Sequence, residues 1–192
     1  MKKILLIFSF IALCNGAFAQ NRVEFAFGSG SFRHTTDVVE CAPNVSITYS
    51  YGFPIFPSLS VGAGAGTRFY VGTGFAPPGG NRKPIFIKEY YRELAIPAFC
   101  FVRYNLQAKQ VSPFVGTKLG FVIPVGVWEP GFETDIVYRG GFVEPEIGVS
   151  FGGSDKQCFS VGLAAVLQNR RNTAEEKSYL STGLKILMGY SF

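Results

Sequence analysis

Apolar and polar side chains alternate along most of this chain, and the pattern is clearest in the last fourteen residues. From Tyr179 to Phe192, one set of alternate positions is apolar and ends in Tyr190 and Phe192. The other set is small or polar apart from Leu187, and it contains the single charge of the segment, Lys185. Successive side chains of a strand point to opposite faces of a sheet. The pattern therefore predicts a strand with one apolar and one polar face.

The same alternation recurs along the chain, and helical periodicity is nearly absent. It predicts eight strands, at 22–29, 44–52, 58–71, 90–105, 112–125, 141–152, 157–168 and 178–192. The connections at 29–43, 72–89 and 126–140 are long, those at 53–57, 106–111 and 153–156 are short, and 169–177 is intermediate. In an up-and-down antiparallel arrangement, the long connections would all lie at one end and both chain termini at the other.

The composition favours a membrane-spanning barrel. Hydrophobic residues make up 47% of the chain and charged residues only 16%, whereas about 25% of the residues of soluble domains are charged. No run of eighteen apolar residues follows the N-terminal segment, which excludes a transmembrane helix there. A transmembrane β-barrel explains both observations, because its strands turn an apolar face to lipid without a long apolar run.

The first nineteen residues are expected to be a cleaved signal peptide. Lys2 and Lys3 precede an apolar stretch at 4–13, and Ala17 and Ala19 stand where signal peptidase requires small residues. This leaves one domain at 20–192, with a formal net charge reduced from +5 to +3, too mild to indicate nucleic-acid binding. Lipid attachment at Cys14 is the weaker alternative, because Leu13 before it is large.

Charged residues collect on the face opposite the apolar one. They are Glu24, Arg68, Glu93, Arg103, Lys118, Glu144, Glu146 and Lys185. A lysine or arginine facing lipid at mid-bilayer costs about 2–4 kcal/mol, so these side chains are expected to fill the interior of the barrel. Depth along the strands predicts two ion pairs, Lys118 with Glu146 and Arg68 with Glu93. No metal or cofactor site is expected, because the chain has a single histidine and its cysteines match no ligand spacing.

Aromatic residues are expected to form girdles at both edges of the apolar face. One group contains Phe53, Phe56, Tyr104, Phe114, Phe151, Phe159, Tyr190 and Phe192, near the end that carries the termini, and the other contains Phe69, Tyr90, Tyr91 and Tyr179.

Three segments resemble a known family: Glu93-Leu94-Ala95-Ile96-Pro97, Val111-Ser112-Pro113-Phe114-Val115-Gly116 and Gly189-Tyr190-Ser191-Phe192. They resemble the small eight-stranded outer-membrane β-barrels, the OmpA/OmpX-like superfamily with its outer membrane protein beta-barrel domain. The resemblance implies a porin-like transmembrane barrel in the outer membrane of a Gram-negative-type cell, with both termini periplasmic. It also implies a C-terminal signal read by the barrel-assembly machinery, formed by Lys185, Tyr190 and Phe192. Leu187 departs from this pattern, because a glycine is more usual there.

The favoured function is a structural or interaction role of the extracellular loops, without catalysis, in a barrel whose interior is filled by side chains. Its partners would be outer-membrane lipids, the assembly machinery and an unidentified extracellular partner. One alternative is a lipid A deacylase-like enzyme in which His34 acts as a general base beside Thr35 or Thr36. That alternative is weakened because His34 falls in a predicted loop without a neighbouring serine. A second alternative is a soluble or lipid-anchored lipocalin-like barrel, which would need an apolar interior.

Overall fold

The computed structural model describes residues 20–35, 38–76, 85–106, 110–128, 136–137, 140–152, 157–172 and 178–192. Within these ranges it describes only the backbone of 31–35, 38–42, 72–76, 85–91, 127–128, 136–137, 170–172 and 178–179. The predicted signal peptide at 1–19 lies outside the described residues. In the part of the chain that is described, no helix is long and apolar enough to cross a membrane.

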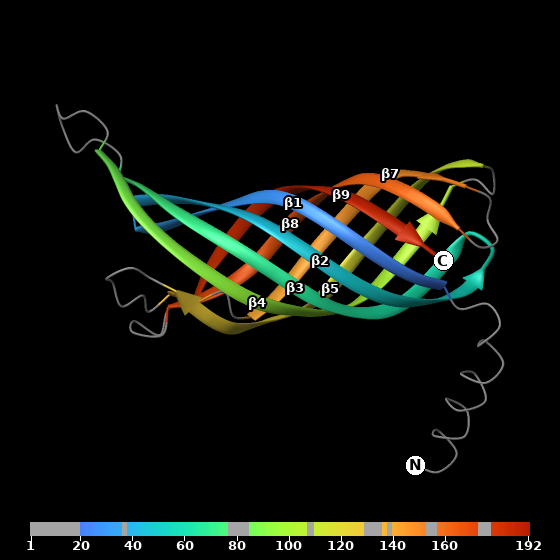
Figure 1. Cartoon of the computed structure of the whole chain (residues 1–192), viewed down its shortest axis with the longest axis horizontal. Helices are drawn as coiled ribbons and strands as arrows, with labels where there is room; N and C mark the ends of the chain where they lie inside the picture. The colour runs from blue at the N-terminus through green and yellow to red at the C-terminus, as the bar shows by residue number, and fades with distance from the viewer. Residues whose placement is uncertain are drawn as a thin grey trace, which may run out of the picture.

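Eight long antiparallel strands form a closed barrel (Figure 1). They are β1 (Gln20–Thr35), β2 (Val38–Phe56), β3 (Leu59–Ala76), β4 (Ile85–Asn105), β5 (Val111–Trp128), β7 (Gly140–Phe151), β8 (Cys158–Asn172) and β9 (Ser178–Ser191). The short β6 (Ile136–Val137) pairs with β8. Each long strand pairs with the next along the chain, and β9 closes the barrel by pairing with β1. The predicted up-and-down barrel is therefore confirmed.

The two ends of the barrel differ. The end at which β1 begins and β9 stops carries the turns at 57–58, 106–110 and 152–157, and we call it the termini end (Figure 1). Here Asn21 and Phe192 exchange backbone hydrogen bonds of 3.0 and 2.9 Å. The opposite end, which we call the loop end, carries the connections 36–37, 77–84, 129–139 and 173–177.

The predicted long loop at 29–43 was wrong. β1 continues to Thr35 and β2 begins at Val38, with paired positions from Ser29↔Pro43 to Arg33↔Val39. The apolar alternation fades in this segment, but antiparallel pairing requires only backbone groups, so the strands extend beyond the patterned part. β3, β4, β5 and β8 also extend further toward the loop end than predicted. His34 consequently lies within β1, at a register shift between Arg33 and Thr35, and its side chain is outside the described residues.

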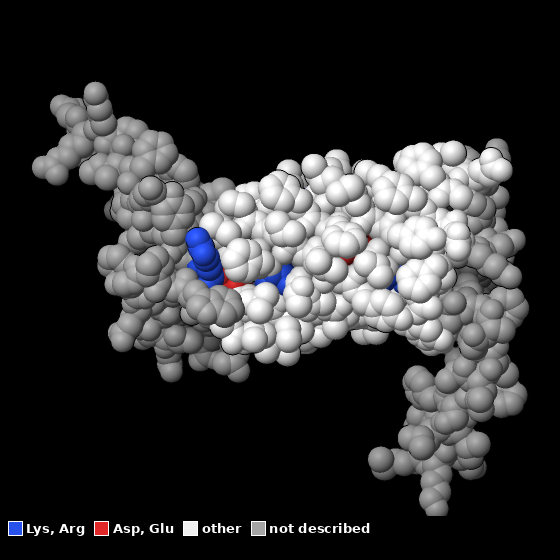
Figure 2. Space-filling view, in the orientation of Figure 1, with Lys and Arg blue, Asp and Glu red and all other residues white. Residues whose placement is uncertain are grey.

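The outer surface of the barrel is apolar. In β9, the predicted outward positions are exposed, and Leu184 reaches 71% exposure, whereas Lys185 and Leu187 face inward and are buried. The other strands repeat this arrangement with exposed residues such as Phe27, Ile47 and Phe121. On the described part of the face in Figure 2, charged atoms appear only in small patches between uncharged side chains, apart from one basic side chain near the grey end. We call this outer surface the apolar belt.

The aromatic residues follow the prediction in part. Exposed rings at the termini end include Phe56, Tyr104, Phe151, Phe159, Tyr190 and Phe192. Phe114 does not belong to this girdle, because it is 1% exposed and points into the barrel. It shares the inward face of β5 with Lys118, four positions away, and the alternation itself places it there. Phe69 is exposed toward the loop end, while the side chains of Tyr90, Tyr91 and Tyr179 lie outside the described residues.

Candidate functional site: the charged interior of the barrel

The interior of the barrel, which we call the lumen, contains all eight charged residues that the sequence predicts there. Each is at most 6% exposed. They come from β1, β3, β4, β5, β7 and β9, whose inward positions alternate with the apolar belt. A buried charge is tolerated only when it is paired and hydrogen-bonded. The contacts among these side chains therefore decide whether the barrel is stable.

Lys118 is the centre of the network. Its ammonium lies against a carboxylate oxygen of Glu24 and is 3.2 Å from Glu146 and 3.6 Å from Glu144. β5 and β1 are separated by three strands on either side of the barrel, so the contact with Glu24 crosses the lumen. The predicted approach of Lys118 to Glu146 is present. The closer contact of Lys118 with Glu24 was not predicted.

Glu144 connects the central lysine to the loop end. It accepts hydrogen bonds from Lys185 at 2.7 Å and from Arg68 at 3.0 Å. Arg68 therefore reaches across from β3 to β7, and Glu144 is the carboxylate that the structure describes beside it. The expected pair of Arg68 with Glu93 stays a prediction, although Glu93 is fully buried nearby, opposite Tyr70 in the ladder of β3 and β4.

Arg22 is a member of the network that sequence reasoning missed. It is 8% exposed, donates a hydrogen bond of 2.7 Å to Glu24 and lies 3.9 Å from Glu146. Its position two residues before Glu24 on β1 places it on the same face, so the alternation rule could have found it. With Arg22, the described lumen contains five basic and four acidic side chains instead of the four of each predicted.

Arg103 stands apart at the termini end. Its guanidinium stacks on the ring of Phe114, 3.4 Å from the centroid, and donates a hydrogen bond of 2.6 Å to Ser150. A ring face attracts a cation, most strongly where water is excluded. Phe114 therefore stabilises Arg103 where the structure describes no carboxylate beside it.

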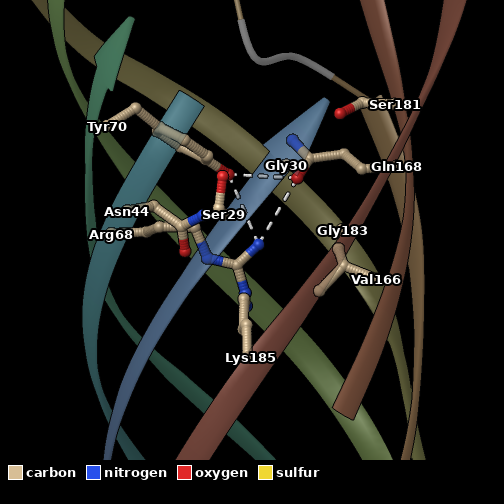
Figure 3. Close-up of a pocket in the computed structure, with 10 residues that line it drawn as sticks. All are labelled: Ser29, Gly30, Asn44, Arg68, Tyr70, Val166, Gln168, Ser181, Gly183 and Lys185. Carbon is tan, nitrogen blue, oxygen red and sulfur yellow. Dashed lines mark hydrogen bonds between the residues drawn. The ribbon is translucent and has the colours of Figure 1, made fainter. Parts of the chain in front are cut away.

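A second polar group crosses the lumen closer to the loop end (Figure 3). Tyr70 donates a hydrogen bond of 3.0 Å to the Oε1 atom of Gln168, and Arg68 Nη1 lies within 3.3 and 3.4 Å of these two oxygen atoms. β3 and β8 are also separated by three strands on either side. Tyr70 and Gln168 were not predicted. Tyr70 shares the inward face of β3 with the predicted Arg68, whereas no lumen charge was predicted on β8. This group lines a small cavity together with Ser29, Asn44, Ser181 and Lys185.

Apolar rings and small residues occupy the rest of the lumen. Phe99, Phe142, Val122 and Ala95 form a buried cluster with Tyr70, and Leu187 packs with Ala26 and Ala164. The cavity beside Tyr70 and Gln168 has space for about one water molecule. Glu24, Glu144 and Glu146 lie beside lysine or arginine, and among the described side chains no group of three could hold a metal ion. The arrangement can stabilise the closed barrel, because its buried charges are paired across the lumen.

No family model matches the sequence, and no curated protein matches it either. Among solved structures, the neisserial surface protein A (NspA) superposes with a TM-score of 0.53 at 13% identity, over 90% of this chain and 95% of that one. The outer membrane enzyme PagL gives a TM-score of 0.39 at 12% identity, over 85% of this chain and 97% of that one. The N-terminal β-barrel domain of Pseudomonas aeruginosa OprF gives 0.30 at 13% identity, over 91% and 99%. The likeness to NspA shows that the chain has the fold of the small outer-membrane β-barrels, as the sequence resemblance implied.

Proposed function

We propose that this chain is an integral outer-membrane protein whose barrel is a sealed, non-catalytic scaffold and whose loop end carries a structural or interaction role. The observation that carries this proposal is the reversed polarity of the barrel. Charged side chains such as Glu144 and Lys118 are buried inside, while large apolar side chains such as Leu184 and Phe121 are exposed outside.

This polarity suits lipid rather than water as the surrounding solvent. Soluble monomers rarely expose a continuous apolar surface of more than a few hundred Å², whereas here exposed apolar side chains occur on all eight long strands. A bilayer also requires every backbone polar group to be satisfied internally, which a closed barrel achieves because it has no free edge. The lipocalin-like alternative expects an apolar interior, and the buried charges of the lumen are opposite to that expectation.

The filled lumen supports a scaffold in preference to a pore. The contact of Lys118 with Glu24 crosses the barrel, and the bond of Tyr70 with Gln168 crosses it again closer to the loop end. Two contacts that cross the lumen favour a filled interior over an open pore. We therefore place the function of this protein at its surface, in the connections of the loop end.

We also propose how the chain is exported and how it is oriented in the membrane. Residues 1–19 would be removed as a signal peptide, and the termini end would lie in the periplasm, since outer-membrane barrels have short periplasmic turns and longer extracellular loops. The C-terminal segment, formed by β9 and Phe192, would be read by the assembly machinery through Lys185, Tyr190 and Phe192. Tyr190 and Phe192 are exposed on the apolar belt and stack on one another, with ring centroids 6.0 Å apart, while Lys185 is buried in the lumen.

The decisive experiment combines membrane fractionation with gel mobility. The protein should be found in the outer-membrane fraction, and an unboiled sample should migrate differently from a boiled one, because closed barrels resist unfolding by detergent. Recovery in the soluble periplasmic fraction would contradict the proposal.

Catalysis is tested separately by mass spectrometry of lipid A from cells that express the wild-type protein, the His34→Ala variant or no protein. The proposal expects identical lipid A in all three. A change that depends on His34 would support the lipid-acting alternative instead.

A further inference from the structure

The barrel is closed by the ladder between its first and last strands, which we call the closing seam. β1 and β9 lie side by side in Figure 1 and pair from Arg22↔Ser191 to Ser31↔Thr182. The other ladders between long strands join strands that follow one another along the chain, so their connections help to set the register. No connection joins β1 to β9 directly. The register of the closing seam must therefore be specified by side chains.

The alternation of polar and apolar residues excludes some errors of register but not all of them. A slip by one residue would turn every side chain of β9 to the opposite face and would bring the lumen charge to the lipid. A slip by two residues keeps each side chain on its own face and also keeps the backbone ladder. It changes the stagger of the closed sheet, and with it the shape of the barrel. Contacts in the lumen have to distinguish the native register from these neighbours.

Two basic side chains lie over the closing seam, each against a glycine of the opposite strand. Arg22 of β1 lies over Gly189 of β9, where an added Cβ atom would be 2.8 Å from the Nε atom of the arginine. Lys185 of β9 is paired with Gly28 of β1, and an added Cβ atom there would clash with the Cγ atom of the lysine. The two glycines therefore leave room for a long side chain from each strand.

Both basic side chains reach the carboxylates of β7. Lys185 donates a hydrogen bond of 2.7 Å to Glu144, and Arg22 lies 3.9 Å from Glu146, two positions further along the same face. Arg22 also donates a hydrogen bond of 3.4 Å to Ser160 of β8. β8 separates β7 from β9, and both β8 and β9 separate it from β1. The two strands of the seam are thus held from the same third strand.

A slip by two residues would break the part of the network that belongs to β1. Arg22 and Glu24 would move about 7 Å along β9, since each residue of a strand advances the chain by about 3.3 Å. Glu24 would leave Lys118, which it contacts across the lumen, and in one direction it would face Leu187 instead of its native partner in the ladder. Buried charges that lose their partners are strongly destabilising. The native register is the one in which both strands satisfy their charges.

We propose that Glu144 and Glu146 of β7 set the register in which the barrel closes. Glu144 holds β9 through Lys185, and Glu146 holds β1 through Arg22, while the opposing glycines admit these side chains only in the native register. Lys185 thereby acts inside the closed barrel, in addition to its proposed part in the C-terminal signal. This inference rests on the proposed transmembrane barrel.

Disulfide cross-linking of the refolded mature barrel measures the register directly. Phe27 pairs with Ile186 on the outer face of the seam, whereas slips by two residues would place it opposite Leu184 or Met188. Phe27→Cys is therefore combined with a cysteine at 186, 184 or 188 in a chain without other cysteines. After refolding in detergent without assembly machinery, oxidation should cross-link only the pair 27–186, because a disulfide requires Cβ atoms within about 4.5 Å of each other. Cell fractionation tests the outer-membrane location separately, so failure of either proposal is recognised independently.

The variant Arg22→Met/Glu24→Gln removes the charges of β1 from the network. One cation and one anion are lost together, so the barrel should still close, but the 27–186 cross-link should decrease and a cross-link to 184 or 188 should appear. The control is Arg103→Met, which removes a lumen cation whose described contacts are with β5 and β7, and it should keep the native cross-link alone. A folded Arg22→Met/Glu24→Gln barrel that is cross-linked only at 27–186 would overturn the proposal.

Gly189→Ala tests the seam while all charges are retained. The added methyl group would meet Arg22, so the substitution should lower the unfolding temperature of the wild-type barrel by several degrees. In an Arg22→Ala background the same substitution should lose most of its effect. The control is Gly30→Ala, whose added Cβ atom would be 3.3 Å from the Oγ atom of Ser181 and should have the same effect in both backgrounds. Equal losses from Gly189→Ala in the two backgrounds would also overturn the proposal.

Discussion

At the scale of single residues, glycines in the lumen make room for phenylalanine rings. Phe99, Phe101 and Phe114 each lie close to where a side chain would begin on an inward-facing glycine. At Gly64, an added Cβ atom would lie 2.7 Å from the ring of Phe99 and 2.6 Å from the carbonyl oxygen of Tyr49. Both distances are too short for carbon, and the carbonyl belongs to the neighbouring strand, so it can move only with the backbone.

We predict that Gly64→Ala destabilises the barrel by about 1–3 kcal/mol, which is typical of overpacking a filled core. The measurement is urea unfolding of the protein in lipid vesicles, followed by tryptophan fluorescence and gel mobility. Ala65→Val is the matched control, because residue 65 is exposed on the apolar belt and added methyl groups there meet lipid. Equal losses for the two variants would show that the lumen is not tightly packed.

Lys118 offers a second prediction at this scale. Replacing it with methionine removes the cation that Glu24, Glu144 and Glu146 share. Breaking a buried pair by deleting one partner costs about 3–5 kcal/mol, because the other charge stays buried without compensation. The folded gel band of Lys118→Met should therefore convert at a clearly lower temperature than that of the wild type, and unchanged heat resistance would exclude the pairing. Arg92→Met serves as the control for loss of an exposed charge.

The effect of Glu146→Gln on the stability of the barrel is expected to have opposite signs in the wild type and in the Lys118→Met variant. In the wild type, Glu146→Gln should destabilise the barrel, because it removes a partner 3.2 Å from Lys118. In the Lys118→Met background, the one cation that the described residues leave beside Glu146 is Arg22 at 3.9 Å, so Glu146→Gln should restore part of the lost stability. A double-mutant cycle measures this coupling. Additive losses would indicate that the two side chains do not interact.

The sequence predicts which residues face the lumen, but it does not predict which of them meet across it. Alternation alone placed eight buried charges correctly, and applied without exception it would also have found Arg22 and Phe114. It could not reveal that Lys118 meets Glu24, because that contact joins strands on opposite sides of the closed barrel. Such contacts depend on how far each strand is staggered against the next, and a single sequence does not contain that information.

At the scale of elements, the apolar pattern predicted all eight long strands but not where they end. The alternation marks the part of a strand that faces the apolar belt, whereas backbone pairing in β1 and β2 continues for several residues beyond it. The unusual Leu187 of β9 is also explained at this scale. It is buried inside the barrel, beside Ala26 on β1 and Gly162 on β8 in the two ladders, so its neighbours are small enough to admit it.

For β9, we predict that Phe192→Ala separates assembly from stability. Phe192 is half-exposed and its ring stacks on that of Tyr190, so its loss should leave the refolded barrel almost as heat-resistant as the wild type. In cells, we expect several-fold less protein in the outer membrane, because the terminal aromatic residue is proposed to be read during insertion. Leu184→Ala, on the same face of β9, is the control and should be inserted normally. Equal amounts of both variants in the membrane would contradict an assembly role for Phe192.

At the scale of the whole molecule, the closed antiparallel topology places every turn at one of two ends. An even number of long strands brings Gln20 and Phe192 to the same end, and the backbone hydrogen bonds between Asn21 and Phe192 hold the start of β1 beside Phe192. Whichever side of the membrane receives the C-terminus therefore also receives the turns at 57–58, 106–110 and 152–157. The protein therefore has two possible orientations, with the termini end either in the periplasm or outside the cell.

We predict that the loop end faces the outside of the cell. Single cysteines are introduced at position 80 or at position 58, as Gly80→Cys or Ser58→Cys, in a chain whose Cys41, Cys100 and Cys158 are replaced by serine or alanine. A membrane-impermeant maleimide should label the variant at 80 in intact cells, because the connection 77–84 belongs to the loop end. It should label the variant at 58 only after the outer membrane is opened, because the turn at 57–58 lies at the termini end. The reverse labelling pattern would place the termini outside, and it would move the proposed interaction surface to the periplasm.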